Sequence, residues 1–258
     1  MKVRPSSPQS LKDFSLLSFD CFGTLVDWRS GIYAHLTALH PRLPASSPLK
    51  DNREALIDAF NDEEVALCNS RPGLLYPTLL SDAYKNLCSK LSLPAPSKAE
   101  TEALGNSVGD WPPFPDTVQA LNRLKKHYRL VILSNVDNAS FDKVLAGPLK
   151  DVAFDAVYTA QDIGTYKPDH NNFNYLFQQV KQSFEVERQQ VLHTGHGLKA
   201  DHVPAKEMGF TSAWIARGDA AGGEGTEVEA TKGKVEFTWQ FETMRDMADA
   251  ADESFGGK

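Results

Sequence analysis

The chain has 258 residues, of which 41% are hydrophobic and 24% are charged, a composition typical of a soluble globular protein with a sizeable core. Its formal net charge is −7 and no basic cluster offsets it, which argues against a nucleic-acid partner. No apolar run approaches the ~20 residues of a membrane-spanning helix, and residues 1–10 lack the apolar stretch of a secretory signal. We therefore expect no membrane partner and a cytoplasmic location.

The first element is an apolar run that ends in an aspartate and a Gly-Thr turn, LLSFDCFGTLVD at residues 16–27. Its first four residues predict a buried strand, with Asp20 where the strand ends and Gly23 allowing a sharp turn. Ligands of open α/β sheets bind just beyond the carboxyl ends of the strands. Asp20 is therefore the first candidate catalytic residue.

The three cysteines show neither the spacing of metal ligands nor a disulfide framework, and we interpret them as reduced, buried thiols: Cys21, Cys68 and Cys88. Cys21 directly follows Asp20 and belongs to the candidate substrate contacts. Side chains alternate along a strand, so if Asp20 faces the cleft, Cys21 faces away. That alternative favours a packing role for its thiol.

A helical block follows, because apolar residues recur at spacings of three and four between residues 28 and 113. We expect helices over residues 30–40, 52–69, 76–91 and 97–108, and a rigid break at WPPFPD, residues 111–116. The block interrupts the strand-and-helix alternation on either side of it. It therefore predicts an inserted helical cap over residues 28–113.

Strands and helices then alternate to the end of the chain, which predicts a doubly wound parallel α/β sheet, a Rossmann-like core. This core comprises residues 11–27 and 114–258. The Gly-rich segment 218–233 is expected to be a mobile loop. The expected strands are 129–135, 156–160, 191–195, 211–216 and 235–239, and the expected helices are 118–127, 140–147, 171–184, 202–209 and 241–251.

Two of these strand ends carry polar groups suited to binding. The strand LVILSN ends in Ser134 and Asn135, whose hydroxyl and amide can donate hydrogen bonds to a substrate carboxylate or to the Asp20 carboxylate. The alternative is a turn in which both residues cap the next helix. Further on, Lys167 lies in GTYKPD and is restricted to extended geometry by Pro168. Its alternative is an ordinary solvated surface lysine.

The last candidate segment is VLHTGHGLKADHVPAKEMGF, residues 191–210, which contains Gly195, His196 and Asp201. His196 directly follows the strand and is expected to line the site without a defined role, or else to be a hydrogen-bonding turn residue. His193 and His202 are expected to be structural or exposed.

These four motifs, in this order, resemble those of the haloacid dehalogenase superfamily. The resemblance implies that Asp20 is a covalent nucleophile, that Lys167 keeps it ionised, and that Asp201 activates water. Two departures from the superfamily's phosphatases stand out. Phe22 replaces their general acid, and His196 replaces a magnesium-binding aspartate, although magnesium prefers oxygen ligands. Both point to the metal-free 2-haloacid dehalogenase-like branch, which implies no metal and no cofactor.

The resemblance also implies a small-molecule substrate, a 2-substituted carboxylate, and leaves a homodimer open. Family members bind the substrate carboxylate with an arginine from the cap, for which Arg53 and Arg71 are candidates. Other family positions differ here, namely Phe173 in place of a tyrosine, and His196 and Leu198 in place of serine and asparagine. The candidate substrate contacts are Cys21, Phe22, Thr24, Trp28, Ser134, Asn135 and His196.

The expected reaction is a two-step hydrolysis through an aspartyl ester on Asp20, which Asp201 and water then cleave. A departing halide needs no proton, which is consistent with the phenyl ring at Phe22. Three alternatives stay open: ring opening of azetidine-2-carboxylate, a phosphatase that uses another acid, and a binding protein without catalysis.

Overall fold

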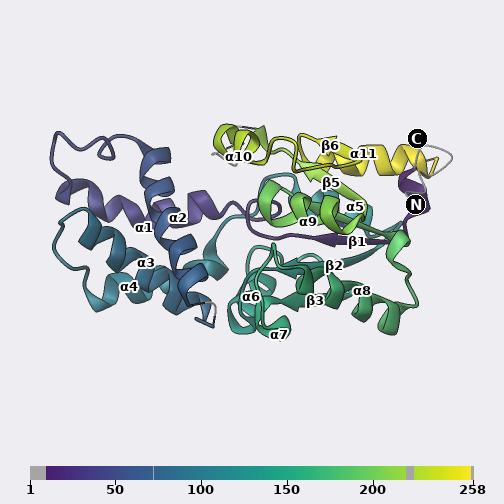
Figure 1. The fold of residues 1–258 in the computed structure, drawn as a ribbon, viewed down its shortest axis with the longest axis horizontal. Helices are drawn as coiled ribbons and strands as arrows, with labels where there is room; N and C mark the ends of the chain where they lie inside the picture. Colours follow the sequence, from purple (N-terminus) through teal and green to yellow (C-terminus); the bar gives the residue numbers. More distant parts are fainter. Residues whose placement is uncertain (1–9, 72, 219–223, 257–258) are drawn as a thin grey trace.

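A parallel sheet forms the centre of the computed structural model, which describes residues 10–71, 73–218 and 224–256 (Figure 1). Within these residues the sheet has six strands in the order β3-β2-β1-β4-β5-β6, and every neighbouring pair is parallel. The strands are β1 (Leu16–Phe19), β2 (Arg129–Ser134), β3 (Ala156–Thr159), β4 (Val191–Gly195), β5 (Ser212–Ile215) and β6 (Trp239–Phe241). The predicted Rossmann-like α/β fold is confirmed.

Side chains of the central strand alternate between two buried layers. Leu17 and Phe19 pack in the core that contains the apolar faces of α5 and α11, whereas Leu16 packs in a second cluster with α8. Helices therefore cover both faces of the sheet, as the alternation of elements predicts. The described helices around the sheet are η1 (Leu11–Asp13), α5 (Thr117–Leu124), α6 (Asn138–Ala146), α7 (Ala160–Ile163), α8 (His170–Phe184), η4 (Arg188–Gln190), η5 (Leu198–His202), α9 (Val203–Met208), α10 (Glu224–Thr231) and α11 (Met244–Ser254).

The segment between β1 and α5 forms a separate group of helices, which we call the helical region, residues 28–110. Figure 1 shows it in blue beside the carboxyl edge of the sheet. Two of its helices begin at polar caps, since Asp27 and Asn52 accept hydrogen bonds from the first turns of α1 and α2. The elements are α1 (Trp28–Leu36), η2 (Thr37–Arg42), α2 (Arg53–Ser70), α3 (Tyr76–Lys90), α4 (Lys98–Gly105) and η3 (Ser107–Asp110).

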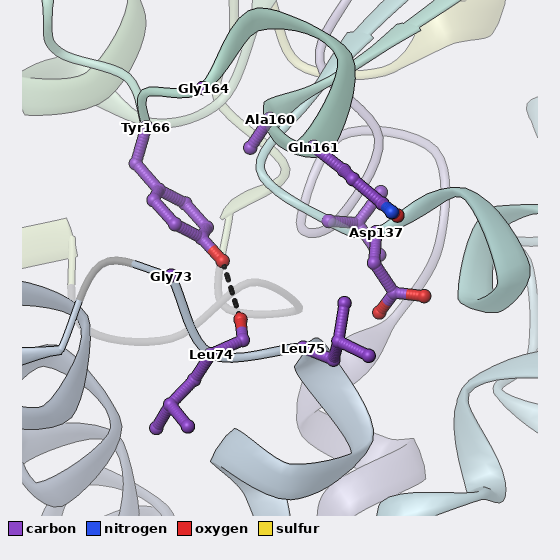
Figure 2. Close-up of a pocket in the computed structure, with 9 residues that line it drawn as sticks. Gly73, Leu74, Leu75, Asp137, Ala160, Gln161, Gly164 and Tyr166 are labelled. Carbon is purple, nitrogen blue, oxygen red and sulfur yellow. Dashed lines mark hydrogen bonds between the residues drawn. The ribbon is translucent and has the colours of Figure 1, made fainter.

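Two hydrogen bonds tie the loop between α2 and α3 to the sheet domain. The Asp137 carboxylate accepts from the backbone N–H of Tyr76 at 2.9 Å, and the Tyr166 hydroxyl donates to the carbonyl of Leu74 at 3.2 Å. Between them lies a pocket with a volume of about 180 Å³, shown in Figure 2. Asp137 follows the end of β2 and Tyr166 precedes Lys167, so the helical region contacts the sheet beside the expected site.

Two expectations near the end of the chain need correction. Part of the segment expected as a mobile loop, residues 218–233, forms the helix α10, while residues 219–223 lie outside the described part. The last strand is Trp239–Phe241 rather than 235–239, because Trp239 pairs with Ala213 and its ring packs against Phe14. Across the described residues no helix is both long and apolar enough to cross a membrane.

Candidate active site

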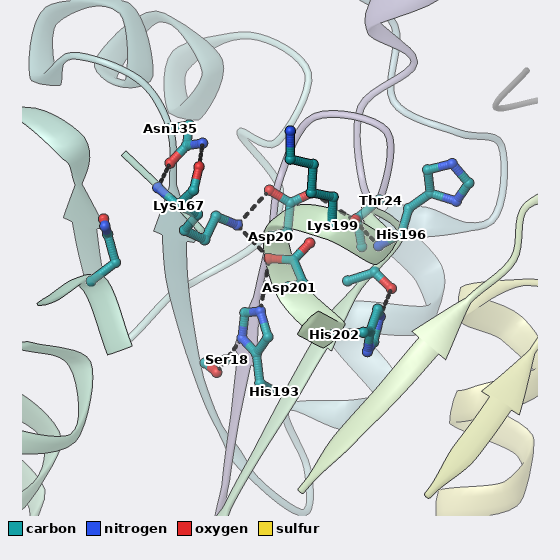
Figure 3. A network of polar contacts seen from close by, with 12 residues as sticks. Ser18, Asp20, Thr24, Asn135, Lys167, His193, His196, Lys199, Asp201 and His202 are labelled. Carbon is teal, nitrogen blue, oxygen red and sulfur yellow. Dashed lines mark hydrogen bonds and ion pairs between the residues drawn. The ribbon is translucent and has the colours of Figure 1, made fainter. Parts of the chain in front are cut away.

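The candidate residues meet at the carboxyl edge of the sheet, around one buried ammonium group. Lys167, in the loop before α8, donates from Nζ to Asp20 Oδ1 at 2.9 Å and to Asp201 Oδ1 at 2.7 Å (Figure 3). Asp20 follows β1 and Asp201 lies in η5, just after β4. The exposed fractions are only 4% for Lys167, 9% for Asp20 and 0% for Asp201. The structure thus brings the three predicted catalytic residues into direct contact.

The ion pairs decide the charge of this cluster. Burial by itself lowers the pKa of Lys167, but Asp20 and Asp201 outweigh it and raise that pKa above its ordinary value. Burial raises the pKa of the Asp201 carboxyl, but Lys167 and a hydrogen bond from His193 hold it well below its usual range. Near neutral pH the lysine is therefore an ammonium and Asp201 a carboxylate.

The turn after β1 fixes the second oxygen of Asp20. Thr24 donates from its hydroxyl to Asp20 Oδ2 at 2.7 Å and accepts from the backbone N–H of His196 at 2.8 Å. Gly23 makes this turn with φ +89°, in the left-handed region that favours glycine. Arg217 donates two hydrogen bonds to the Thr24 carbonyl, at 3.0 and 2.6 Å, and braces the turn from behind. Both carboxylate oxygens of Asp20 therefore accept hydrogen bonds, Oδ1 from Lys167 and Oδ2 from Thr24.

Asn135 holds the backbone of Lys167 rather than pointing toward Asp20. Its side chain accepts from the Lys167 backbone N–H at 2.7 Å and donates to the Lys167 carbonyl at 3.0 Å. This pair of bonds directs the amide toward the Lys167 backbone and shows no contact between Asn135 and Asp20. Ser134 differs, because its hydroxyl is buried and has no hydrogen-bond partner among the described residues. It keeps a free donor at the end of β2.

Asp201 has one engaged and one free oxygen. Its Oδ1 accepts from Lys167 Nζ and from His193 Nε2 at 3.0 Å, whereas Oδ2 is buried without a partner in the described part of the chain. The carboxylate lies directly over Gly195, where an added Cβ would be 2.5 Å from Oδ2. Glycine is therefore required at that position for steric reasons.

Aromatic rings line the side toward the helical region. Phe22 stacks on Tyr76 with ring centroids 5.9 Å apart and meets the edge of Trp111 at 5.4 Å. Trp28, at the start of α1, approaches the Gly23 turn, where its Nε1 would lie 3.3 Å from an added Cβ. Phe22 and Trp28 thus both lie beside the turn that follows Asp20, and Phe22 places an apolar ring two residues after this carboxylate.

The side chains of two candidate substrate contacts do not point into the site. The side chain of Cys21 is fully buried in the main hydrophobic core, and burial together with Asp20 raises the pKa of its thiol. This placement supports the packing alternative. The His196 ring bonds the carbonyl of Ile215 through Nδ1 at 3.0 Å and turns away from the carboxylates. His196 contributes its backbone N–H to the site instead.

The arginines of the helical region are committed to other partners. Arg53 pairs with Glu54, and Arg71 pairs with Asp82 at 2.9 Å. Arg29, which is buried, pairs with Glu54 at 2.5 Å. Neither arginine that the sequence suggested as a carboxylate ligand is therefore free in this conformation.

Sequence reasoning missed three supporting residues. His193 and His202, which were expected to be structural or exposed, are fully buried near Asp201, and Arg217 donates hydrogen bonds to the Thr24 carbonyl. Two signals were available: a histidine inside the buried strand VLHTG, and an arginine two residues after β5 at the same carboxyl edge. Paired carboxylates on a buried ammonium at this edge of a parallel sheet are typical of an enzyme active site.

Comparisons with known proteins show the family and the fold of the chain. A family model described as haloacid dehalogenase-like hydrolase matches residues 14–209. The chain is similar to (S)-2-haloacid dehalogenase H-109 of Pseudomonas putida, with 26% identity over 202 residues that cover 77% of this chain and 84% of that protein. Its fold is similar to L-2-haloacid dehalogenase RSc1362, with TM-score 0.72, 23% identity, and coverage of 95% of this chain and 100% of that one.

A further structural relative carries a covalent ligand. The L-2-haloacid dehalogenase of Xanthobacter autotrophicus, solved with chloropropionic acid covalently bound, superposes with TM-score 0.69 at 17% identity, covering 92% of this chain and 97% of that one. Since the family model matches most of the chain, the protein belongs to the haloacid dehalogenase-like hydrolase family. It is an enzyme, a hydrolase similar to the 2-haloacid dehalogenases.

Proposed function

We propose that the protein hydrolyses the carbon–halogen bond of a small 2-halocarboxylate through an ester on Asp20. The observation that carries this proposal is Lys167 Nζ, which bonds Asp20 and Asp201 at 2.9 and 2.7 Å. One ammonium thereby holds a nucleophile and a base side by side. The (S)-2-haloacid dehalogenase similarity supports the substrate class.

In the first step Asp20 displaces the halide. A carboxylate oxygen of Asp20 attacks C2 of the substrate from the side opposite the halogen, and the halide leaves with the bonding electrons. No proton is transferred, which is consistent with Phe22 at the position of the phosphatase acid. The free hydroxyl of Ser134 is suited to donate to the substrate carboxylate.

In the second step water cleaves the ester. Asp201 accepts a proton from water, and the hydroxide attacks the carboxyl carbon of Asp20 rather than the substrate carbon. Lys167 and Thr24 already donate to the two Asp20 oxygens, so they are placed to stabilise the negative charge that develops there. Collapse of this intermediate breaks the bond between the Asp20 carboxyl carbon and the ester oxygen. The departing alkoxide takes the proton held by Asp201 and leaves as the 2-hydroxycarboxylate, and the Asp20 carboxylic acid releases its proton to solvent, so that both carboxylates are regenerated.

The residues present do not fit a magnesium ion, which other members of the superfamily use. One oxygen of each carboxylate accepts from Lys167 Nζ, and the second oxygen of Asp20 accepts from Thr24. The His196 ring is turned toward Ile215, and a histidine nitrogen is a poor ligand for magnesium. No step of the mechanism is therefore assigned to a metal.

We further propose that the helical region acts as the cap of the site, with domain boundaries at 28–113 and a core of 11–27 and 114–258. The stacking of Phe22 on Tyr76 and the hydrogen bond from Tyr76 to Asp137 support a closing role. Cap closure would exclude bulk water during the first step. A cytoplasmic location and a homodimer stay predictions.

Halide release is the direct test of the proposed function. Protein treated with a chelator should release chloride from (S)-2-chloropropionate and leave the (R) enantiomer largely unreacted, and added magnesium should not change the rate. Azetidine-2-carboxylate and a generic phosphate ester belong in the same panel. Ring opening alone would favour the first alternative. Phosphate release that depends on magnesium would overturn the proposal in favour of a phosphatase, and no turnover of any compound would favour a binding protein.

A further inference from the structure

A buried chain of hydrogen bonds joins Asp201 to His193 and His193 to Ser18. His193, inside β4, bonds Asp201 Oδ1 through Nε2 at 3.0 Å and Ser18 Oγ through Nδ1 at 2.9 Å (Figure 3). The ring packs edge-on against Phe173 at 5.2 Å. Ser18, His193 and Asp201 all have exposed fractions of 0%. The chain therefore runs from the middle of β1 to the carboxylate with no contact to solvent.

The chemistry of the partners gives this chain a direction. An ionised carboxylate can only accept, so Nε2 of His193 carries the proton that binds Asp201. In the neutral ring Nδ1 then has a lone pair, and the Ser18 hydroxyl donates to it. Ser18 thus fixes the tautomer that His193 needs in order to donate to Asp201.

We propose that His193, oriented by Ser18, is a positioning residue for the hydrolysis step of the proposed function. Together with Lys167 it supplies two donors to Asp201 Oδ1, which fixes the rotation of the carboxylate and occupies that oxygen. Oδ2, which has no partner among the described residues, is left to accept the proton of the attacking water. The first step, attack by Asp20, does not use this chain.

The charges around Asp201 give the proposal a second consequence. The ionisable groups around it are Lys167, His193 and His202, and Lys167 and the hydrogen bond from His193 are the main causes that lower the pKa of Asp201. Burial lowers the pKa of His202 to about 4, so that ring is neutral near neutral pH. Removing His193 takes away a hydrogen bond to the ionised form, so the pKa of Asp201 rises. The rate of ester hydrolysis falls at low pH because Asp201 becomes protonated, and without His193 this fall should begin at a higher pH.

His202 offers a matched control within the same site. Its Nδ1 bonds Ser212 Oγ at 2.9 Å and its Nε2 bonds the Gly195 carbonyl at 3.0 Å. A buried histidine is thus paired with a buried serine in both cases, but only the pair of Ser18 and His193 leads to the Asp201 carboxylate. Ser18→Ala and Ser212→Ala therefore remove equivalent hydroxyls with different expected effects.

The test compares His193→Phe, His193→Gln, Ser18→Ala and Ser212→Ala in chloride release and in intact mass during turnover. In His193→Phe steady-state turnover should fall on the order of tenfold or more, the ester should accumulate on Asp20, and the acidic limb should shift upward. Gln, whose amide can still donate to Asp201, should restore most of the turnover. Ser18→Ala should show the same direction of change as His193→Phe, and Ser212→Ala should behave as the wild type.

Melting temperatures of all four variants separate misfolding from a mechanistic effect, and Ser18→Ala decides the matter if His193→Phe does not fold. Three results would overturn the inference. They are equal slowing of both steps in His193→Phe without accumulated ester, no recovery of turnover in His193→Gln, and equal loss of turnover in Ser18→Ala and Ser212→Ala. If Asp201→Asn accumulates ester and His193→Phe does not, the inference fails while the proposed function stands. If no variant and no wild-type sample ever carries an ester, the proposed function fails and the inference falls with it.

Discussion

Substitution of Asp20 by asparagine is expected to abolish turnover, with a loss of about 10⁴-fold or more, because an amide oxygen is a far weaker nucleophile than a carboxylate. The replacement keeps the size of the side chain, and its oxygen can still accept from Lys167 or Thr24. A loss of activity would therefore result from the loss of nucleophilic attack and not from a change in the structure of the turn after β1. Chloride release from purified protein measures the effect.

The matched control for this variant is Asp142→Asn, which removes an exposed carboxylate from α6, outside the site. Circular dichroism and melting temperature should be close to the wild type for both variants. The Asp20→Asn protein should also carry no added mass after incubation with substrate. Residual activity near the wild-type level would place the nucleophile at another residue.

Substitution of Asp201 by asparagine is expected to stop the reaction after its first step. Asp20 can still displace the halide, but no carboxylate accepts the proton of water, so hydrolysis of the ester should slow by about 10²- to 10⁴-fold. An amide oxygen at this position can still accept from Lys167 or His193, which limits structural damage. Intact-mass measurement should show an adduct equal to the substrate without its halide.

Digestion of that adduct should place the added mass on the peptide that contains Asp20. The double variant Asp20→Asn, Asp201→Asn is the control and should remain unmodified. Asp201→Asn protein that stays unmodified, although it is folded and mixed with a compound that the wild type consumes, would show that Asp201 acts before or during the first step.

Much of the fold was predictable because its elements follow local periodicity. Continuous apolar runs predict the strands of a parallel sheet, and the spacing of three and four in residues 28–113 predicts helices, both of which the structure contains. The exceptions depend on contacts outside the local pattern. Trp239 is a strand residue because it pairs with Ala213 and packs on Phe14, neither of which a window of neighbouring residues reveals.

The three catalytic candidates could also be named from the sequence, because Asp20 and Asp201 follow β1 and β4 at the carboxyl edge and Lys167 lies in a Gly-x-x-Lys-Pro motif before α8. The directions of several side chains could not be predicted. Asn135 turns back to the Lys167 backbone, and the His196 ring turns to Ile215, although both residues lie at positions that a motif assigns to the site. The role of His193 depends on Ser18, which is adjacent only through sheet register. Long-range register of this kind is absent from a local sequence pattern.

The central claim is that water attacks the carboxyl carbon of Asp20, and a single-turnover reaction in ¹⁸O-labelled water tests it most directly. With protein in excess over (S)-2-chloropropionate, the label should appear in the Asp20 peptide, and the 2-hydroxycarboxylate should carry only the oxygen that came from Asp20. Attack at the Asp20 carboxyl carbon places the water oxygen in that carboxyl group, and cleavage between this carbon and the ester oxygen leaves the former Asp20 oxygen in the product. Label found in the first-turnover product, with none in the Asp20 peptide, would show direct attack of water on the substrate and contradict the account.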